Sequence, residues 1–394
     1  MNKIKRRRLF SLCLLALILF CGGCNQAADK DQVAEDSPGG IPAKVIEDIP
    51  AADSVLLFDA NNIYYFSESV AMASDDAQDM TLYRQNLETK AKTELAQMAG
   101  VKSSANVCHL AGDKLYYTCN TLEASVLWKI DINGGAQRTL KEWRDNTIFA
   151  RVYGLNDKIV LFCQKATAGR ATYTVEIIDP KSQESDSIMA MARDSSGGEE
   201  LLGLDTDQES IYGYVIAQDT AGQIHKIVQY NAKGEETAAF ILPSEEIDAF
   251  LTPENTPNED TDAIFSLEKA GDFFILRTLN GRIKIYQQEA NSLTAVTTPS
   301  EFYQTYPGGW QLIAAQPDIY FVHTYKAQDN LYRFDTKTGD FFVATLPFTT
   351  ETINSCYGNG EGDLLIKKLN LENPEIQDLT LIKSAAIEFA KINP

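Results

Sequence analysis

The sequence predicts an all-β protein built from a repeated unit, and three observations lead to this prediction. A turn rich in Asn, Asp or Gly followed by an intensely apolar strand occurs seven times, with strand starts at 63, 115, 159, 211, 273, 319 and 364. Successive starts are 44 to 62 residues apart. Tyr and Phe are plentiful beside Ile, Val and Leu, and this is the composition typical of strands.

A second unit follows most of these strands after 15 to 20 residues, and it consists of an alternating strand and a polar turn. Examples are residues 127–131 with the turn at 133–135, and residues 331–335 with the turn at 338–339. The alternation places one face of the strand inward, and the Asn, Asp and Gly pairs are hairpin turns. Each repeat therefore holds about four strands joined by tight turns.

Four-stranded sheets at this period are typical of a β-propeller. A lone four-stranded sheet leaves two faces exposed, whereas a ring of sheets buries each face against a neighbour. We expect seven blades, with six or eight as alternatives. The last repeat runs into residues 379–382 and 386–389, and a strand near residues 44–46 is expected to complete it.

The chain begins with a segment that has the three parts of a secretory signal peptide. Five basic residues lie within positions 3–8, an apolar run follows over 9–21, and Gly22 and Gly23 precede Cys24. The apolar run is 13 residues long, whereas a membrane-spanning helix needs about 20. The sequence therefore predicts export, with residues 1–23 as the signal peptide.

This exit resembles the bacterial lipoprotein signal, in which small residues precede a cysteine that is acylated and becomes the new N-terminus. The resemblance implies that Cys24 carries lipid and tethers the protein to a membrane, since two or more acyl chains give stable anchoring. Cys21 stands where Leu is usual, and ordinary secretion is the alternative. Residues 24–41 are polar and end in Pro-Gly-Gly, so we expect a flexible tether before a propeller domain over 42–394.

The charge of the chain excludes some partners. The full sequence has 35 basic and 55 acidic residues, and the first 23 residues hold five of the basic ones and none of the acidic ones. The formal net charge therefore changes from −20 to −25 when the signal is removed. This balance argues against binding nucleic acid or anionic lipid headgroups through a basic surface.

Four cysteines remain beyond Cys24: Cys108, Cys119, Cys163 and Cys356. Their scattered positions favour buried free thiols, with a Cys108–Cys119 bridge as the alternative. Cys119 and Cys163 occupy equivalent repeat positions, so we expect them in different gaps between blades and not paired.

The sequence contains no set of residues that points to a specific chemistry. The three histidines, His109, His225 and His323, fall at non-equivalent positions of three repeats, and we expect neither a metal nor a cofactor. Acidic clusters at 205–209 and 258–262 lack the glycine and distal glutamate of a calcium loop and are interpreted as solvated turns. Two segments that exceed the repeat, 67–80 and 244–263, are interpreted as surface loops.

The best candidate for ligand binding is the connection over residues 302–310. Tyr303, Tyr306 and Trp310 flank a Pro-Gly-Gly turn between two repeats, and these aromatic side chains suit stacking on a sugar or a peptide. The alternative is that Trp310 begins the next inner strand and lies in the core.

The repeat units, Asp-x-hydrophobic-Tyr-Tyr and Leu-Tyr/Trp-x-Ile/Phe-Asp-x-x-x-Gly, resemble propeller domains related to the low-density-lipoprotein receptor. The segment Asp335-Thr336-Lys337-Thr338-Gly339 is also similar to quinoprotein-type repeats of outer-membrane assembly lipoproteins. The first resemblance implies a bacterial surface lipoprotein. Because no catalytic set is found, we expect a non-enzymatic binding or scaffold propeller in the bacterial cell envelope, with an unidentified protein or glycan ligand. The alternatives are an outer-membrane assembly scaffold, or a propeller hydrolase or lyase that acts on envelope glycans.

Overall fold

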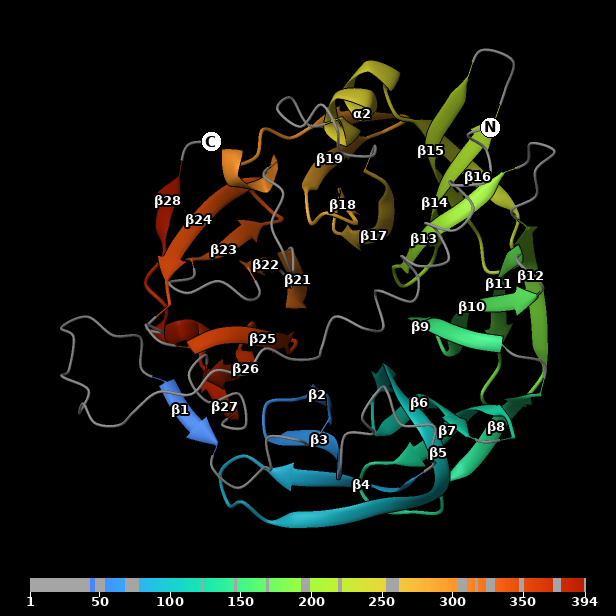
Figure 1. Cartoon of the computed structure of the whole chain (residues 1–394), viewed down its shortest axis with the longest axis vertical. Helices are drawn as coiled ribbons and strands as arrows, with labels where there is room; N and C mark the ends of the chain where they lie inside the picture. Colours follow the sequence, from blue (N-terminus) through green and yellow to red (C-terminus); the bar gives the residue numbers. More distant parts are fainter. Residues whose placement is uncertain are drawn as a thin grey trace, which may run out of the picture.

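The computed structural model describes residues 43–46, 54–67, 78–121, 123–144, 147–167, 170–192, 199–218, 222–252, 262–303, 310–315, 318–323, 330–346, 351–370 and 377–392. The strands form six antiparallel sheets around a common axis (Figure 1). The chain is therefore an all-β propeller with four-stranded antiparallel blades, as the sequence predicted. No helix in the described ranges is long and apolar enough to cross a membrane. Cys24 and the tether lie outside these ranges.

Four consecutive sheets have their strands in chain order. The first three consist of β9 (Thr147–Leu155), β10 (Lys158–Thr167), β11 (Arg170–Ile178) and β12 (Ser185–Ala192); β13 (Glu200–Thr206), β14 (Ile211–Gln218), β15 (Gln223–Tyr230) and β16 (Glu236–Ile241); and β17 (Ile264–Ala270), β18 (Phe273–Thr278), β19 (Ile283–Glu289) and β20 (Ser292–Ala295). The fourth contains β21 (Trp310–Ala315), β22 (Asp318–His323), β23 (Asn330–Asp335) and β24 (Asp340–Thr345).

A seven-stranded sheet precedes them. Its strands are β2 (Ser54–Phe58), β3 (Asn62–Ser67), β4 (Gln78–Asn86), β5 (Lys92–Ala111), β6 (Lys114–Thr121), β7 (Ser125–Asp131) and β8 (Arg138–Trp143). The 20-residue strand β5 pairs with β4 from its start and with β6 toward its end. The pairing of β5 with β6 is irregular between Ser104 and Cys108.

The N-terminal strand completes the last sheet, which confirms the expectation from the sequence. This sheet holds β25 (Glu351–Gly358), β26 (Leu364–Asn370) and β27 (Gln377–Ile382), and β1 (Ala43–Ile46) adds to it as the outer strand. In the antiparallel pairing of β1 with β27, Ala43 stands opposite Ile382. Residues more than 300 positions apart thus join the two ends of the described chain.

The C-terminal segment departs from the expected continuation over 386–389. A short 3-10 helix, η2 (Ser384–Ala386), leads to β28 (Ala390–Ile392), which pairs with β24 as a fifth strand of the neighbouring sheet. Ile387 is buried in the core next to this sheet, and Phe389 packs against that core. This core is shared by the sheet of β21–β24 and the sheet of β25–β27, so the segment that leads to β28 is anchored between the two.

The seven apolar strands found in the sequence are β3, β6, β10, β14, β18, β22 and β26, and each is paired on both edges. Their side chains alternate between two cores. In β14, Tyr212 and Tyr214 pack toward β18, whereas Ile211 and Val215 pack toward β10. Burial on both faces removes the polar positions that usually alternate along a strand, so these strands are almost wholly apolar.

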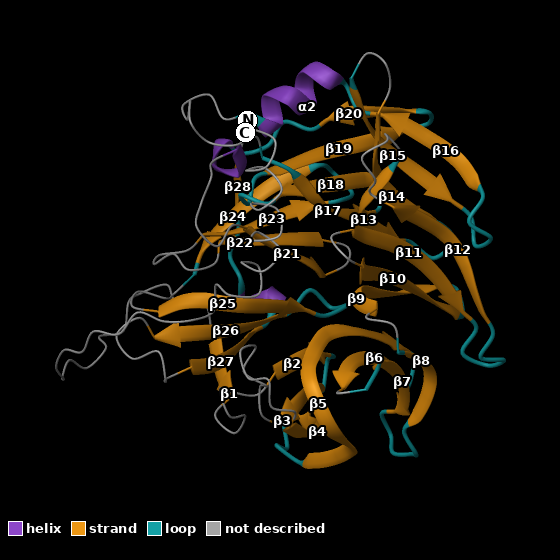
Figure 2. Ribbon diagram, turned by 45° about the vertical axis from the view of Figure 1, so that its right-hand side comes forward, coloured by secondary structure: helices purple, strands orange, loops and turns teal. Residues whose placement is uncertain are grey.

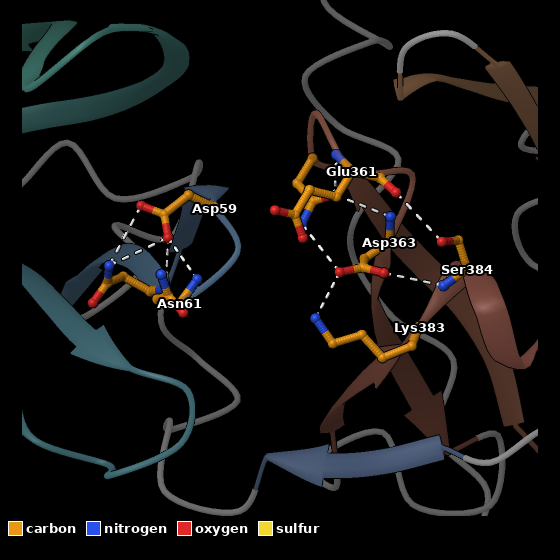
Figure 3. A network of polar contacts seen from close by, with 8 residues as sticks. Asp59, Asn61, Glu361, Asp363, Lys383 and Ser384 are labelled. Carbon is orange, nitrogen blue, oxygen red and sulfur yellow. Dashed lines mark hydrogen bonds and ion pairs between the residues drawn. The ribbon is translucent and has the colours of Figure 1, made fainter.

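Aspartates cap two of the turns that lead into these strands, and Figure 3 shows the one at Asp59. Asp59 Oδ1 accepts the backbone N–H groups of Asn61 and Asn62, both at 2.8 Å, and Asp59 Oδ2 accepts from the Tyr64 hydroxyl at 2.9 Å. Asp207 repeats this arrangement with the residues that follow it. Other turns of this kind use a left-handed residue before Asp: Gly112, Asn156 and Gly271.

The acid of the second repeat unit caps the turn between the third and fourth strands. Asp335 Oδ1 accepts the N–H groups of Lys337 at 2.8 Å and Thr338 at 3.2 Å. Equivalent bonds are made by Asn86, Asp131, Asp179 and Asn231. The repeated Asp-x-x-x-Gly pattern is therefore explained by turn geometry, which needs an acceptor for two converging N–H groups.

The four described cysteines are free thiols. Cys119 packs in the core between β3 and β6, whereas Cys163 packs in the core between β6 and β10. The two therefore occupy different gaps, as predicted from their equivalent repeat positions. Cys108 is half-buried, and in the pairing of β5 with β6 it stands opposite Tyr117, whereas Cys119 stands opposite Ser104. The alternative Cys108–Cys119 bridge is therefore not formed.

The interpretation of residues 244–263 as a surface loop is wrong for its first part. Residues Ser244–Leu251 form helix α2, which contacts β15 (Figures 1 and 2). Ile247, Phe250 and Leu251 are buried in the core shared by β14 and β18, whereas Glu245 and Asp248 are exposed. The apolar spacing of three and four residues is typical of an amphipathic helix. Residues 253–261 lie outside the described ranges, as do 68–77 of the other predicted loop.

Candidate functional site

The predicted aromatic site is only partly within the described residues. Tyr306 lies outside them, and Tyr303 ends a short 3-10 helix, η1 (Ser300–Tyr303). Trp310 begins β21 and is 4% exposed, with its ring 5.0 Å from Phe302 and 5.2 Å from His323 between centroids. Trp310 therefore lies in the core, where the alternative interpretation placed it. Ligand binding by Tyr303 and Tyr306 stays a prediction.

Side chains link neighbouring innermost strands around the ring. These strands each stand at one edge of a sheet: β2, β9, β13, β17, β21 and β25. Each of these strands has one edge without a strand partner, so its backbone groups need other partners. The Gln311 amide donates to the Cys356 carbonyl at 2.7 Å and accepts the Cys356 N–H at 2.9 Å, which imitates a strand bridge. The Thr206 hydroxyl likewise donates to the Gly154 carbonyl at 2.9 Å. These contacts fix neighbouring inner strands at a defined separation.

An ion pair near the axis connects two inner strands that are not neighbours. Arg151 of β9 and Glu268 of β17 meet at 2.5 Å between Nη1 and Oε1. The Arg151 side chain is 37% exposed and that of Glu268 is 17% exposed, so water still reaches the pair. Strand β13 contacts both β9 and β17 and therefore lies between the two partners.

Gly203 allows β13 and β17 to lie close together. A Cβ atom on Gly203 would stand 2.8 Å from the Leu267 backbone nitrogen and 3.1 Å from the Ser266 carbonyl carbon. No side chain fits between these strands at this level. The close approach helps to bring Glu268 within reach of Arg151.

Asp205 bridges the same two strands from β13. Its Oδ2 accepts the Lys269 backbone N–H at 2.6 Å, and its Oδ1 accepts its neighbour's N–H at 2.8 Å. Burial is the larger cause and the nearby Glu268 carboxylate the smaller one of a shift that raises the pKa of Asp205 to about 8.

This shift predicts a pH dependence of stability. Asp205 keeps its proton in the folded state from about pH 4 to about pH 8, whereas the unfolded chain loses it near pH 4. The free energy of unfolding should therefore fall as pH rises through this window, by up to roughly 1.4 kcal/mol per pH unit. Asp205→Asn removes the titrating group and should flatten the slope measured by urea unfolding at pH 5 and pH 8. Equal slopes in wild type and variant would contradict the assignment.

Arg277 of β18 lies beside this group. Its Nη1 donates to the Trp310 carbonyl at 2.9 Å, and its guanidinium carbon stands 4.8 Å from the centroid of the Phe265 ring. Burial lowers the pKa of Arg277 to about 10; the Glu268 carboxylate opposes this shift, and the charge of Arg151 adds to it. In the described part of the chain, Arg277 forms no ion pair within 4.0 Å. The axial site is defined here as Arg151, Asp205, Phe265, Glu268 and Arg277.

The other sequence candidates do not converge on this site. The Asp207 carboxylate binds its own turn and the Tyr212 hydroxyl, so it does not share a cation with Asp205. His225 is buried, and its Nδ1 stands 2.5 Å from the Tyr214 hydroxyl. Among the described residues, no three His, Cys, Asp or Glu side chains come together in a way that could hold a metal ion.

Two charged residues within otherwise apolar segments are the sequence signal for the axial site. Arg151 interrupts the apolar segment Thr-Ile-Phe-Ala-Arg-Val-Tyr, and Glu268 follows Ile-Phe-Ser-Leu. A charged residue within a first strand of a repeat points to the axis, because the other positions pack between blades. The partner could not be found in this way, since 117 residues separate Arg151 from Glu268.

Comparisons with known proteins identify the fold. No family model matches the chain, and no curated protein matches its sequence. The β-propeller domain of the Trilobed protease from Pyrococcus furiosus is similar at a TM-score of 0.54 and 12% identity, over 88% of this chain and 97% of that one. The Pyrococcus horikoshii acylaminoacyl peptidase is similar at a TM-score of 0.55 and 12% identity, over 91% of this chain and 53% of that one.

The chain thus spans about half the length of that peptidase. At 12% identity the likeness is one of fold, a β-propeller. The Pyrococcus furiosus domain is described as having an open velcro topology, whereas β1 pairs with β27 in this chain.

Proposed function

We propose that this protein is a lipid-anchored, extracytoplasmic β-propeller that binds a ligand at the axial site and performs no chemistry on it. The observation that carries the proposal is the group of charged side chains from β9, β13, β17 and β18 beside an otherwise apolar set of strands. Charged groups in such surroundings cost free energy unless they are paired. A cluster of this kind is typical of functional sites.

We infer that the ring has seven blades. The seven-stranded sheet then consists of two blades that share β5, with the irregular register between Ser104 and Cys108 as the passage from one blade to the next. This count is supported by the seven apolar strands, each of which would be the second strand of a blade: β3, β6, β10, β14, β18, β22 and β26. The resemblance to propellers related to the low-density-lipoprotein receptor supports the same architecture, but its repeated acids are turn caps and do not indicate a ligand.

The anchor rests on the sequence around Cys24. Cells that express the full chain and are fed an alkyne-bearing palmitate should incorporate the label, and the protein should sediment with membranes. Cys24→Ala should abolish labelling and release the protein, because no acyl chain remains. Cys21→Ala is the matched control and should keep the label. Labelled Cys24→Ala protein would refute the anchor.

Binding without chemistry is tested with full-length protein in detergent and cell-envelope glycans or peptidoglycan fragments as probes. We expect retained probes to be recovered unchanged, and Glu268→Gln to reduce retention by disrupting the pair with Arg151. The alternative, a glycan hydrolase or lyase, predicts released products. Turnover that disappears in Glu268→Gln would favour that enzyme and contradict the proposal.

A further inference from the structure

The two arginines of the axial site have different partners. The site holds two guanidinium groups, Arg151 and Arg277, and two carboxyl groups, Asp205 and Glu268. Arg151 Nη1 pairs with Glu268 Oε1 at 2.5 Å, whereas Arg277 has only the Trp310 backbone carbonyl as its hydrogen-bond acceptor. Among the described residues, the Arg277 guanidinium therefore has no carboxylate within 4.0 Å.

The hydrogen-bond donors of Arg277 are also incompletely used. The Nε atom is buried and has no acceptor in the described structure. Leaving a buried donor of a charged group without an acceptor is costly, and natural proteins avoid it outside functional sites. A planar guanidinium suits a carboxylate in particular, because its N–H groups can bond both carboxylate oxygens at once.

Phe265 provides a flat surface beside this guanidinium. The register of β17 with β18 shifts between Ile264 and Ser266, so Phe265 is the extra residue of a β-bulge. Bulges redirect side chains and often stand next to binding sites. Here the Phe265 ring is only partly buried and lies 4.8 Å from the guanidinium carbon of Arg277.

We propose that the axial site binds a small organic carboxylate that carries an aromatic ring. Its carboxylate oxygens bond Arg277, and its ring stacks beside Phe265. This inference rests on the proposed function and names the ligand class of that site. The bound carboxylate supplies the anion that the second arginine lacks. A polyanion is disfavoured, because the chain as a whole carries a formal net charge of −20.

The test compares three probes on full-length protein in detergent: benzoate, the neutral isostere benzamide, and acetate. Isothermal titration and the thermal unfolding midpoint are measured for each. We expect benzoate to bind and to raise the midpoint, acetate to bind more weakly, and benzamide to have no effect. Arg277→Gln should weaken benzoate binding roughly tenfold or more, as expected for loss of charge-assisted hydrogen bonds.

Two further variants control for the loss of any arginine and for misfolding of Arg277→Gln. Arg144→Gln, which removes an exposed arginine, should leave benzoate binding unchanged. If Arg277→Gln does not fold, Phe265→Leu replaces it and should weaken benzoate binding while leaving acetate binding unchanged. Equal binding of benzoate and benzamide would overturn the carboxylate assignment but keep an axial binding site. Absence of benzoate binding, or undiminished binding in Arg277→Gln, would also overturn it.

Discussion

Replacing Asp262 with alanine is expected to lower the free energy of unfolding by about 3–5 kcal/mol, because it leaves a buried charge without a partner. Asp262 Oδ2 lies 3.3 Å from Arg282 Nε, and the two side chains are 1% and 3% exposed. Asp262 Oδ1 also accepts the N–H groups of Ala263 at 2.9 Å and Asn280 at 3.2 Å. Urea unfolding of wild type and variant measures the difference.

Two companion variants separate charge from packing. Asp248→Ala removes an exposed aspartate from α2 and should change stability by less than about 0.5 kcal/mol. The double variant Asp262→Ala/Arg282→Met removes both charges and should recover most of the loss, since a paired deletion leaves no isolated ion. A double variant as unstable as the single one would show that the ion pair is not the cause.

Gly203→Ala is expected to lower the free energy of unfolding by roughly 1–3 kcal/mol, because the added methyl group meets backbone that cannot move aside cheaply. Its Cβ would stand 2.8 Å from the Leu267 nitrogen, closer than real contacts allow. Strand β13 must then move away from β17. The bond from Lys269 N–H to Asp205 should lengthen, and the pair of Arg151 with Glu268 should weaken.

Gly360→Ala is the matched control for this prediction. Gly360 lies in the turn between β25 and β26, and no heavy atom stands within 4 Å of a Cβ built on it. The same chemical change should therefore have little effect on the urea midpoint. Equal losses in the two variants would mean that the contact with Leu267 is not the cause of the loss in Gly203→Ala.

The repeat was predictable from the sequence because its cause is local. A strand buried on both faces has to be apolar along its whole length, as in Ile-Tyr-Tyr-Phe of β3 and Ile-Val-Leu-Phe of β10. A turn that brings two N–H groups together needs an acceptor such as Asp335 at a set distance along the chain. Both requirements recur with each blade, so they appear as a period in the sequence.

Helix α2 and strand β28 were not predicted, since their sequences are short and their partners distant. The buried face of α2 consists of Ile247, Phe250 and Leu251 among acidic residues, and its apolar neighbours come from β14 and β18. The three-residue strand β28 has no strand signal of its own. Its place follows from the free outer edge of β24, where Lys391 Nζ also meets Asp340 Oδ2 at 2.6 Å.

The sequence by itself determined the all-β architecture, the position of the second strands, the N-terminal closing strand and the separation of Cys119 from Cys163. Each follows from burial patterns that lie within a few residues of one another. Only the tertiary structure decided that Arg151, Glu268 and Arg277 share one site. Curving the sheets into a ring brings residues from different blades together near the axis, and no local pattern records which charges meet there.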